Sequence, residues 1–459
     1  MNSFKIHIPE RIKSVLNKLH RAGHEAYVAG GCVRDTFLGK EPHDWDIATT
    51  AAPKEVQSLF DGFQQIDTGL KHGTVMVVID KEVVEITTFR VDGEYSDGRR
   101  PDTVSFTASI TEDLSRRDFS INACAATDTL LIDPFGGRED AKNQLIRCVG
   151  NPVQRFTEDA LRILRGIRFA SVLNFKVEEK TKAAMFECMK LLKNVSQERI
   201  TVEFCKTLPG NNVRNTLLEF RDILVFILPE IKEMAGFEQH NQYHVYDVYE
   251  HSLKAVESIE SSNILKVAMF FHDIGKPSCF TLDEKNVGHF YGHPEISAEM
   301  TEKILQRMKF STADSRVITE LIKFHDMQIG STTKSVKKLL SKLGEVQFRR
   351  LLKVKRADIM AQNPIFANRK LKSLDIVQLM LEEIIAANAC VSIRDLAING
   401  EDLIHHGFPQ GKQIGIVLNR LLQMVINEEL ENNKDALLEK ARLSSLWPVK
   451  QKHPQNTKY

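Results

Sequence analysis

The sequence has no long apolar run: nowhere do about eighteen apolar residues follow one another, the length that a membrane-spanning helix needs. The opening stretch, MNSFKIHIPE, lacks the apolar core of a secretory signal. The seven cysteines include no C-x-x-C pair, and an odd, scattered set gives no disulfide framework. These absences argue against a secreted or membrane-bound protein, and we expect a cytoplasmic one that binds no membrane.

The chain also lacks an excess of charge of either sign. It has 62 basic and 61 acidic residues and a formal net charge of +1, so any nucleic-acid surface must be a local patch. Repeats and low-complexity segments are absent as well. With 459 residues, of which 42% are hydrophobic, there is ample material for sizeable cores in about three domains.

One stretch, Tyr27–Ala51, concentrates residues suited to phosphate chemistry. It reads as a short buried strand, then Gly30-Gly31, which lets the backbone turn and approach a phosphate, then the start of a helix. In the extended segment that follows, Asp44 and Asp46 would lie on one face, and paired hard oxygen ligands suit Mg²⁺. The alternative is that the aspartates cap a turn and the glycines form a loop.

The surrounding pattern predicts an α/β unit. A helical apolar stripe covers Arg11–Arg21, and a second short helix is expected over Pro53–Phe60. Two β-branched runs, Thr74–Ile79 and Val83–Phe89, predict a hairpin. The second run carries Glu85, either a third carboxylate near the aspartate pair or a solvated strand residue.

Two guanidinium groups adjoin a carboxylate at Arg116-Arg117-Asp118. Arginine binds phosphate oxygens in a planar, charge-assisted fork, so the pair could clamp a triphosphate while Asp118 holds a ribose hydroxyl. The alternative is an ion-pair cluster on the surface.

A helix is predicted over Phe156–Ala170, with Thr157 as its N-cap. Asp159 and Arg162 would then be neighbours on one face. A carboxylate only accepts and a guanidinium only donates, so this pair complements the pairing edge of cytosine or adenine but not that of uracil or guanine. One protein pair could therefore select two bases. The alternative is a local salt bridge between them.

The motifs GGCVRD, HDWDIATTA, RRDFSINA, DPFGG and EDALRILRGIRFA resemble the class II family of tRNA nucleotidyltransferases and bacterial poly(A) polymerases. The resemblance is close over about the first 170 residues and weaker beyond them. It implies an α/β nucleotidyltransferase head, a small sheet flanked by helices, followed by a mostly α-helical body. It further implies Mg²⁺ as cofactor, with tRNA, CTP and ATP as partners, and catalytic roles for Asp44 and Asp46. The nucleotide-binding residues implied are Gly30, Gly31, Arg34, Arg116, Arg117, Asp118, Asp159, Arg162, Arg165 and Arg168.

The resemblance implies roles for two further segments. The segment between Arg90 and Phe106 is rich in Gly, Asp, Arg and Pro and predicts an exposed, mobile loop. In the family this place holds a flexible loop associated with adding the terminal A. The segment LAINGEDLI and the helical residues after it resemble the family's tail, which helps to hold the tRNA elbow.

The middle of the chain is rich in histidine, and KVAMFFHDIGKP and GHFYGHPEIS resemble the HD superfamily. His and Asp from several helices can form a divalent-metal site, so a second divalent metal is possible here; the alternative is a helical scaffold with buried, satisfied histidines. We expect His240 and His244 to be surface residues. The expected ligands are His251, His272, Asp273, His293, His325 and Asp358.

Basic residues crowd the segment from Lys334 to Arg356, which contains Glu345 as its only acidic residue. Such a stretch could follow an RNA backbone, or it could be a solvated helix face. The candidate RNA contacts are Lys334, Lys337, Lys338, Arg349 and Arg350.

The combined prediction has four domains: a catalytic head (1–150), a helical neck for base recognition (151–235), an HD-type metal domain (236–365) and a tRNA-binding body and tail (366–459). The predicted function is untemplated addition of CCA to tRNA. The alternatives are a partial-CCA enzyme or poly(A) polymerase of the same family, and an HD phosphohydrolase acting on RNA ends or nucleotides. The sequence leaves the oligomeric state open.

Overall fold

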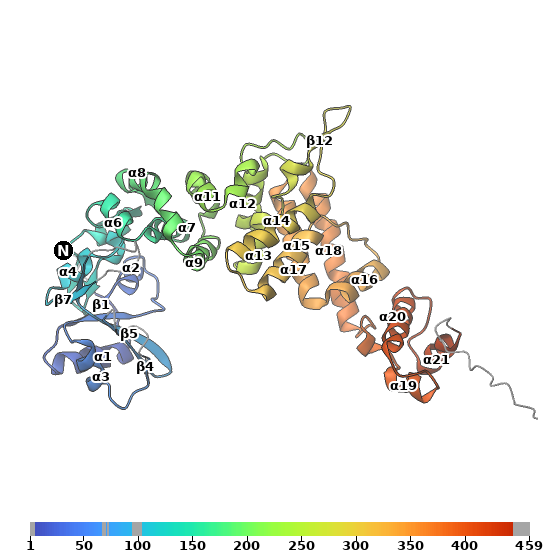
Figure 1. The fold of residues 1–459 in the computed structure, drawn as a ribbon, viewed down its shortest axis with the longest axis horizontal. Helices are drawn as coiled ribbons and strands as arrows, with labels where there is room; N and C mark the ends of the chain where they lie inside the picture. The colour runs from blue at the N-terminus through green and yellow to red at the C-terminus, as the bar shows by residue number, and fades with distance from the viewer. Residues whose placement is uncertain (1–4, 67–69, 71–72, 94–102, 444–459) are drawn as a thin grey trace, which may run out of the picture. The chain divides into compact units, whose positions relative to one another are not determined.

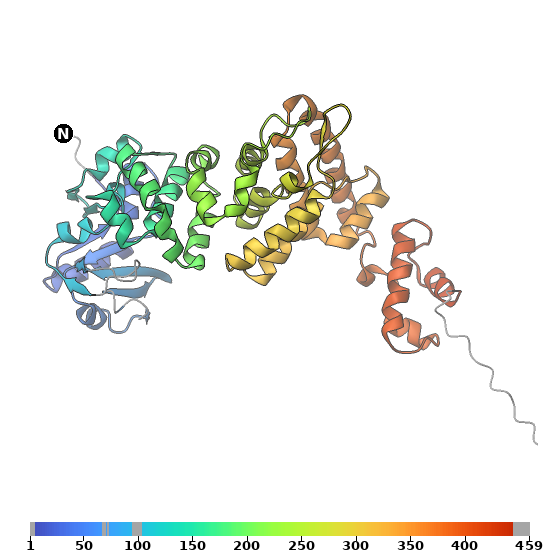
Figure 2. The same ribbon diagram turned by 45° about the horizontal axis from the view of Figure 1, so that its top comes forward.

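The structure is a computed structural model that describes residues 5–66, 70, 73–93 and 103–443. It divides into two compact units (Figures 1 and 2). The first comprises Met1–Phe237 with Glu260–Val267 and Thr301–Ser315, and the second comprises Glu238–Ile259, Ala268–Met300 and Arg316–Tyr459. The break at Phe237 lies close to the predicted boundary at 235, while the finer four-part division remains a prediction.

The first unit begins with a seven-stranded mixed sheet in the order β3-β4-β5-β2-β1-β8-β9. β1 is antiparallel to β2 and β8, whereas β2 and β5 run parallel. The strands are β1 (Ala26–Ala29), β2 (Asp46–Thr49), β3 (Gln65–Ile66), β4 (Thr74–Ile79), β5 (Glu82–Thr88), β8 (Ala125–Ala126) and β9 (Leu131–Ile132), with a separate pair β6 (Arg90–Asp92) and β7 (Val104–Phe106). The helices are α1 (Glu10–Arg21), α2 (Gly31–Phe37), α3 (Pro53–Leu59), α4 (Ile110–Ser115), α5 (Gly137–Lys142) and the 3-10 turn η2 (Ser120–Asn122).

In β4 every second side chain is buried, whereas in β1 and β2 consecutive side chains, which point to opposite faces, are buried. The sheet therefore has a core on each face. On one face, α1 packs against β1 and α3, and α3 packs against β4 and β5, in a core that includes Leu19, Val56 and Val77 (Figure 1). The other face packs around Phe89 and Leu114. The predicted β4–β5 hairpin forms, and the prediction of an α/β head is confirmed.

The loop predicted between Arg90 and Phe106 is described only at its ends. Its flanks, β6 and β7, pair antiparallel with Arg90 opposite Phe106. Residues 94–102, the stretch expected to take part in adding the terminal A, lie outside the described residues.

The helix predicted over Phe156–Ala170 is wrong as a single element. The structure has α6 (Pro152–Glu158) and α7 (Leu161–Leu173), separated by Asp159 in an extended conformation at φ −144° and ψ 101°. Thr157 lies inside α6, and the N-cap is Asn151, whose side chain accepts from the Gln154 N–H at 3.2 Å. The continuous apolar pattern hid the break, because an apolar stripe does not report the backbone angles of the polar residue between two helices.

The rest of the first unit is helical, as predicted. Its elements are α8 (Glu179–Cys188), η3 (Met189–Asn194), α9 (Gln197–Thr207), α10 (Val213–Glu219), α11 (Arg221–Ile227) and η4 (Pro229–Met234), with a short parallel pair β10 (Leu145–Ile146) and β11 (Lys176–Val177).

The later helices complete a mostly α-helical body, as predicted (Figure 1). They are α12 (Val248–Ser258), α13 (Asn263–Phe271), α14 (His293–Arg307), α15 (Thr312–Phe324), α16 (Thr333–Leu343), α17 (Glu345–Ala361), α18 (Pro364–Ala386), α19 (Gly400–His405), α20 (Lys412–Ile426) and α21 (Lys434–Arg442), together with η5 (Lys276–Cys279), η6 (Ile393–Asp395) and the pair β12 (Thr281–Leu282) and β13 (Gly288–His289). Residues 396–441 bury a core of their own around Leu403 and Leu437.

All seven cysteines lie among the described residues and are free thiols, as the sequence predicts. Over the part of the chain that is described, no helix has both the length and the apolar character that crossing a bilayer requires.

Candidate functional site

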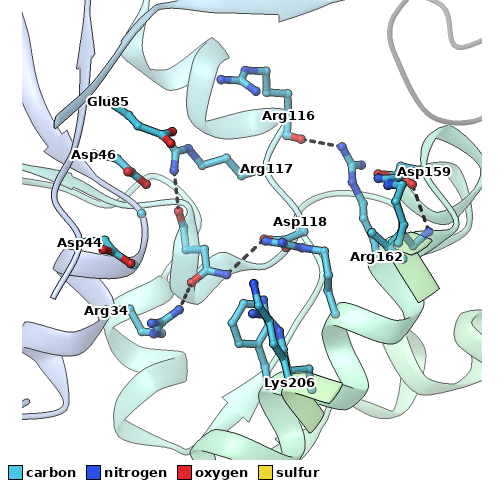
Figure 3. A pocket seen from close by; sticks show the side chains of 18 of the residues that line it. Arg34, Asp44, Asp46, Glu85, Arg116, Arg117, Asp118, Asp159, Arg162 and Lys206 are labelled. Atoms are coloured by element: carbon cyan, nitrogen blue, oxygen red, sulfur yellow. Dashed lines mark hydrogen bonds and ion pairs between the residues drawn. The ribbon is translucent and has the colours of Figure 1, made fainter. Parts of the chain in front are cut away.

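A pocket of about 860 Å³ opens in the first unit, between the sheet and α7 (Figure 3). Every residue predicted to bind the nucleotide or its metal in the head and neck lines this one pocket, although these residues come from segments more than a hundred positions apart. They are Gly30, Gly31, Arg34, Asp44, Asp46, Arg116, Arg117, Asp118, Asp159, Arg162, Arg165 and Arg168.

Three carboxylates occupy one wall of the pocket, those of Asp44, Asp46 and Glu85 (Figure 3). Asp46 opens β2, and the parallel register that pairs Ile47 with Ile86 brings Glu85 alongside it. Burial raises the pKa of Asp46, and Asp44 adds to the rise while Arg117 opposes it. Burial and the charges of Asp46 and Asp44 likewise raise the pKa of Glu85. Glu85 thus lies near the aspartate pair, as the third-carboxylate interpretation predicts, but its side chain is exposed, so the solvated-strand alternative stays open. The three carboxylates repel one another without a cation between them.

Gly30 has a backbone conformation that favours glycine, and the Arg117 side chain lies close to it. Its φ is +83°, a region that side chains other than glycine rarely adopt, and an added Cβ would lie 2.6 Å from Nη1 of Arg117. This close approach leaves the Arg117 guanidinium beside the turn that follows β1. The GG pair thus places a cation next to the carboxylate wall.

A hydrogen-bonded network fixes the floor of the pocket. Asn122 accepts from Arg34 Nη1 at 2.8 Å and donates to Asp118 at 3.2 Å. Asp118 also accepts from Arg165 Nε at 2.6 Å. Burial alone would raise the pKa of Asp118, but Arg165 and the hydrogen bond from Asn122 outweigh it and hold the pKa at about 2.

Asp118 and Arg116 thus have internal partners. Arg116 donates to Asp113 Oδ1 from Nε and Nη2 at 3.0 and 2.8 Å, the ion-pair arrangement weighed as the alternative for this tripeptide. The backbone carbonyl of Arg116 accepts from Arg162 Nη2 at 3.0 Å, linking it to α7.

Asp159 and Arg162 lie on the opposite side of the pocket from the three carboxylates (Figure 3). They do not form the local salt bridge considered as the alternative, because each has another partner. Arg199 on α9 donates to Asp159 Oδ2 at 2.7 Å, and Arg162 Nη1 donates to Glu158 Oε2 at 2.9 Å. The break between α6 and α7 places Asp159 at this wall, a position that the continuous helix would not have given it.

Seven pocket residues were missed from the sequence: Trp45, Val83, Asn122, Leu161, Phe169, Arg199 and Lys206. The guanidinium of Arg168 lies over the ring of Phe169 at 4.4 Å from its centroid. Asn122 and Phe169 belong to motifs already singled out, RRDFSINA and EDALRILRGIRFA, so a closer look at those motifs could have found them. Arg199 and Lys206 lie on α9, where no sequence signal separates them from ordinary surface residues.

A second cluster lies in the second unit and gathers all six residues predicted for the HD site. His251 lies on α12, His272 and Asp273 follow α13, His293 begins α14, His325 follows α15, and Asp358 lies on α17. His251 Nε2 is 3.0 Å from Asp358 Oδ1, and His293 Nε2 is 3.3 Å from Asp273 Oδ1. The side chains of the four histidines and Asp273 are buried.

Backbone carbonyls orient the four imidazole rings. The Nδ1 atoms of His272, His293 and His325 lie 2.7, 2.8 and 2.6 Å from the carbonyls of Met269, Phe290 and Ile322. A carbonyl oxygen can only accept, so Nδ1 carries a proton, and whenever the ring is neutral Nε2 presents a lone pair to the cluster. His251 has the same arrangement with Ala361 at 3.3 Å.

A pocket of about 310 Å³ opens onto this cluster. It is lined by His244, which the sequence had assigned to the surface; that assignment is wrong, and burial lowers the pKa of His244 to about 2. His240, assigned with it, is exposed as expected.

The basic segment is less free than its sequence suggested. Acids from α18 join Glu345: Arg349 Nη2 donates to Glu382 at 2.8 Å, and Arg356 pairs with Asp375 at 2.5 Å. Lys337 pairs with Glu428 at 3.7 Å, and Arg350 donates to Gln347 at 3.4 Å, while Lys334 and Lys338 are exposed. RNA contact by these residues remains a prediction, with Lys334 and Lys338 its most accessible members.

Comparisons with known proteins agree with this geometry. Three family models match: "Poly A polymerase head domain" over residues 26–147, "Probable RNA and SrmB- binding site of polymerase A" over 174–234, and tRNA nucleotidyltransferase domain 2 over 289–441. None of these descriptions names the HD superfamily, so that assignment stays a prediction.

Relatives match along nearly the whole chain. The CCA-adding enzyme of Lactobacillus helveticus is 37% identical over 427 residues, covering 92% of this chain and 94% of the relative. That of Pediococcus pentosaceus is 36% identical over 432 residues, covering 94% and 96%. Among solved structures, the Bacillus stearothermophilus CCA-adding enzyme in complex with CTP superposes with a TM-score of 0.70 at 27% identity, covering 94% of this chain and 96% of that one.

Proposed function

This chain belongs to the family of CCA-adding enzymes, and we propose that it is a tRNA nucleotidyltransferase that builds or repairs the 3′-terminal CCA of tRNA. It uses CTP and ATP without a nucleic-acid template and releases pyrophosphate. The observation that carries the proposal is the pocket of the first unit, where three carboxylates face the Asp159 and Arg162 pair across a basic floor. A reaction that joins a selected nucleotide to an RNA end needs these two walls together. We place this activity in the cytoplasm.

The carboxylate wall fits Mg²⁺. Asp44, Asp46 and Glu85 supply hard oxygen ligands, and the raised pKa values of Asp46 and Glu85 reflect burial together with mutual repulsion that a cation would relieve. Bound there, Mg²⁺ would activate the RNA 3′-hydroxyl and offset charge on the triphosphate.

The remaining residues hold the nucleotide. Arg117, beside the turn at Gly30, and Arg34 on α2 present guanidinium groups to the phosphates, so the α-phosphorus faces the carboxylate wall. Asp118 keeps Arg165 in place through the 2.6 Å ion pair, and contact of Asp118 with a ribose hydroxyl stays part of the proposal. The 3′-hydroxyl oxygen then forms a bond to the α-phosphorus as the bond to pyrophosphate breaks.

Base selection falls to Asp159 and Arg162. Glu158 and the Arg116 carbonyl hold the Arg162 guanidinium, and Arg199 holds the Asp159 carboxylate, so both are fixed before a nucleotide arrives. Uracil or guanine would leave a buried donor or acceptor unpaired, which costs about 1–3 kcal/mol for each group. CTP and ATP avoid that cost because their pairing edges match.

An extension assay tests this function against its neighbours in the family. The substrates are tRNA lacking CCA, tRNA ending in C and tRNA ending in CC, each supplied with CTP or ATP separately. CTP should extend the first two, and ATP should extend only the third. Extension with only one of the two nucleotides, CTP or ATP, would indicate a partial-CCA enzyme, and long runs of A would indicate a poly(A) polymerase.

A second candidate function rests on the histidine cluster. We propose that it holds a divalent metal, because the buried Nε2 atoms of His251, His272 and His293 converge on the carboxylate oxygens of Asp273. A metal there would be compatible with phosphohydrolase chemistry on RNA ends or nucleotides. Metal analysis of stripped and reloaded protein tests it: equal metal content in the wild type and His272→Ala would overturn the proposal.

A further inference from the structure

A buried carboxylate behind the pocket of the first unit faces the two arginines that follow it in the sequence. Asp113 lies in α4, is 1% exposed and is not among the residues that line the pocket, so it does not contact a nucleotide there. Its two oxygens face different arginines, Arg116 and Arg117. Each of these arginines leads to a different side of the pocket.

The Oδ1 atom of Asp113 holds Arg116. It accepts from Nε and Nη2 of Arg116 at 3.0 and 2.8 Å, so the guanidinium is fixed at two points. Nη1 of Arg116 also lies 3.9 Å from Asp92 Oδ2. The backbone carbonyl of Arg116 accepts from Arg162 Nη2 at 3.0 Å, the dashed line between these two residues in Figure 3. Through Arg116, Asp113 is connected to one of the two residues proposed to read the base.

The Oδ2 atom of Asp113 faces Arg117. It lies 3.6 Å from Nη2 of Arg117 and, although buried, accepts no hydrogen bond from the residues that the structure describes. The Arg117 side chain extends toward the carboxylate wall, and its Nη1 donates to the Asn122 carbonyl at 3.4 Å (Figure 3). The attraction to Asp113 and this long hydrogen bond therefore orient the guanidinium that is proposed to face the phosphates.

The backbone around α4 fixes the Asp113 carboxylate itself. The N–H of Arg90, at the start of β6, donates to Asp113 Oδ1 at 3.3 Å. Leu114, the next residue of α4, is buried in the core on that face of the sheet. Asp113 thus places a fixed negative charge between two adjacent guanidinium groups, which would otherwise repel each other.

We infer that Asp113 is a positioning residue that sets the phosphate-binding and base-reading sides of the pocket together. Without its charge, Arg117 is free to turn away from the phosphates, and the backbone carbonyl that holds Arg162 loses its anchor. This inference rests on the proposed nucleotidyl transfer and adds a specificity-determining residue that touches no substrate. A role in folding alone would lower the amount of active protein and hence kcat, but it would change neither KM nor the preference between nucleotides.

The test measures two quantities on full-length protein with tRNA lacking CCA: KM for CTP, and the ratio of kcat/KM for CTP to that for UTP. Asp113→Asn removes the charge and keeps the size of the side chain. Arg117→Ala and Arg162→Ala each change one side of the pocket directly. Glu112→Gln removes the neighbouring charge of α4, which is exposed, and is the matched control.

Asp113→Asn should raise KM for CTP roughly 10-fold and lower the CTP-to-UTP ratio roughly 10-fold, the scale of one charge-assisted hydrogen bond. Arg117→Ala should mainly raise KM, Arg162→Ala should mainly lower the ratio, and Glu112→Gln should change neither. Adding Asp113→Asn to Arg117→Ala should raise KM little further, because the same contact is already lost.

A change in only one of the two quantities, or in neither, would overturn the inference and leave nucleotidyl transfer intact. A wild type that incorporates no CTP would instead overturn the proposed function. Circular dichroism checks that each variant is folded. If Asp113→Asn does not fold, Asp113→Glu carries the test, because it keeps the charge and moves it by one methylene. It should change both quantities in the same directions, and no change in either would overturn the inference.

Discussion

Both sites of this chain are built around aspartate, but the residues around the aspartates differ. In the head, Asp44, Asp46 and Glu85 line a pocket of about 860 Å³ and supply only oxygen. In the second unit, Asp273 is buried among four imidazoles and lines a smaller pocket of about 310 Å³. The first arrangement suits an ion that keeps water and shares its ligands with a phosphate chain, and the second suits an ion held mainly by protein.

The difference in burial also decides which ligands can enter each site. A wide pocket lined by several arginines, among them Arg34 and Arg117, admits a triphosphate and an RNA end. The histidine cluster fixes its rings through backbone carbonyls before any ligand arrives. We therefore expect variants of one site to leave the other intact.

The largest expected effect comes from the head. Asp46→Ala should lower CTP incorporation at least roughly 1,000-fold, because it removes a metal ligand that touches the reacting phosphate. The measurement is single-turnover extension of tRNA lacking CCA. Asp61→Ala, at an exposed aspartate of the same unit, is the matched control and should keep normal activity. Near-normal incorporation by Asp46→Ala would show that the three carboxylates do not take part in nucleotide transfer.

The converse change is in the second unit. His272→Ala should abolish or sharply lower the transition-metal content of the cluster while CTP incorporation stays within about threefold of the wild type. His289→Ala, at the same pocket, should keep both. A large fall in incorporation with His272→Ala would show that the two sites are not independent, and the comparison would fail.

The next effect in size is on base selection. Arg162→Ala removes a charge-assisted donor, worth about 1.5–3 kcal/mol, so discrimination against UTP and GTP should fall roughly 10- to 100-fold before transfer is lost. The measurement is the ratio of kcat/KM for CTP to that for UTP. Arg307→Ala, an arginine paired with Glu230 in the same unit and away from the pocket, is the control. An unchanged ratio in Arg162→Ala would exclude the base-reading role.

The smallest effect is on stability in acid. Asp118 has a folded-state pKa of about 2 against an ordinary value of 3.8. A depressed carboxylate pKa contributes stability that is fully present above about pH 4 and is lost as the pH falls toward 2, on the order of 2 kcal/mol.

Asp118→Asn should therefore be less stable than the wild type at neutral pH, and the gap should narrow between about pH 4 and 2. Urea unfolding at several pH values measures this difference in the free energy of unfolding, with Asp61→Asn as the control. A gap that does not change with pH would contradict the ion pair with Arg165.

The sequence predicted the head well because its signals are local. The β-branched runs of β4 and β5, the glycine pair and the D-x-D spacing each specify a short piece of backbone, and the motifs contain most of the residues that line the pocket. The seven-stranded order was beyond the sequence, since β2 and β5 pair across more than thirty residues and pairing of that range leaves no local pattern.

The failures have physical causes of the same kind. The break at Asp159 depends on one residue's backbone angles, which the apolar stripe on either side does not report. His244 was expected at the surface, yet tertiary packing places it in the pocket beside the histidine cluster. The acids that neutralise Arg349 and Arg356 come from α18 and were invisible in the basic segment itself.

One measurement tests the central claim most directly: extension of tRNA lacking CCA in the presence of all four nucleotides, with sequencing of the product ends. The account predicts that the wild type adds two C residues and one A and then stops, and that Asp46→Ala adds none. Wild-type products that end in U or G, or that carry long runs of A, would contradict it.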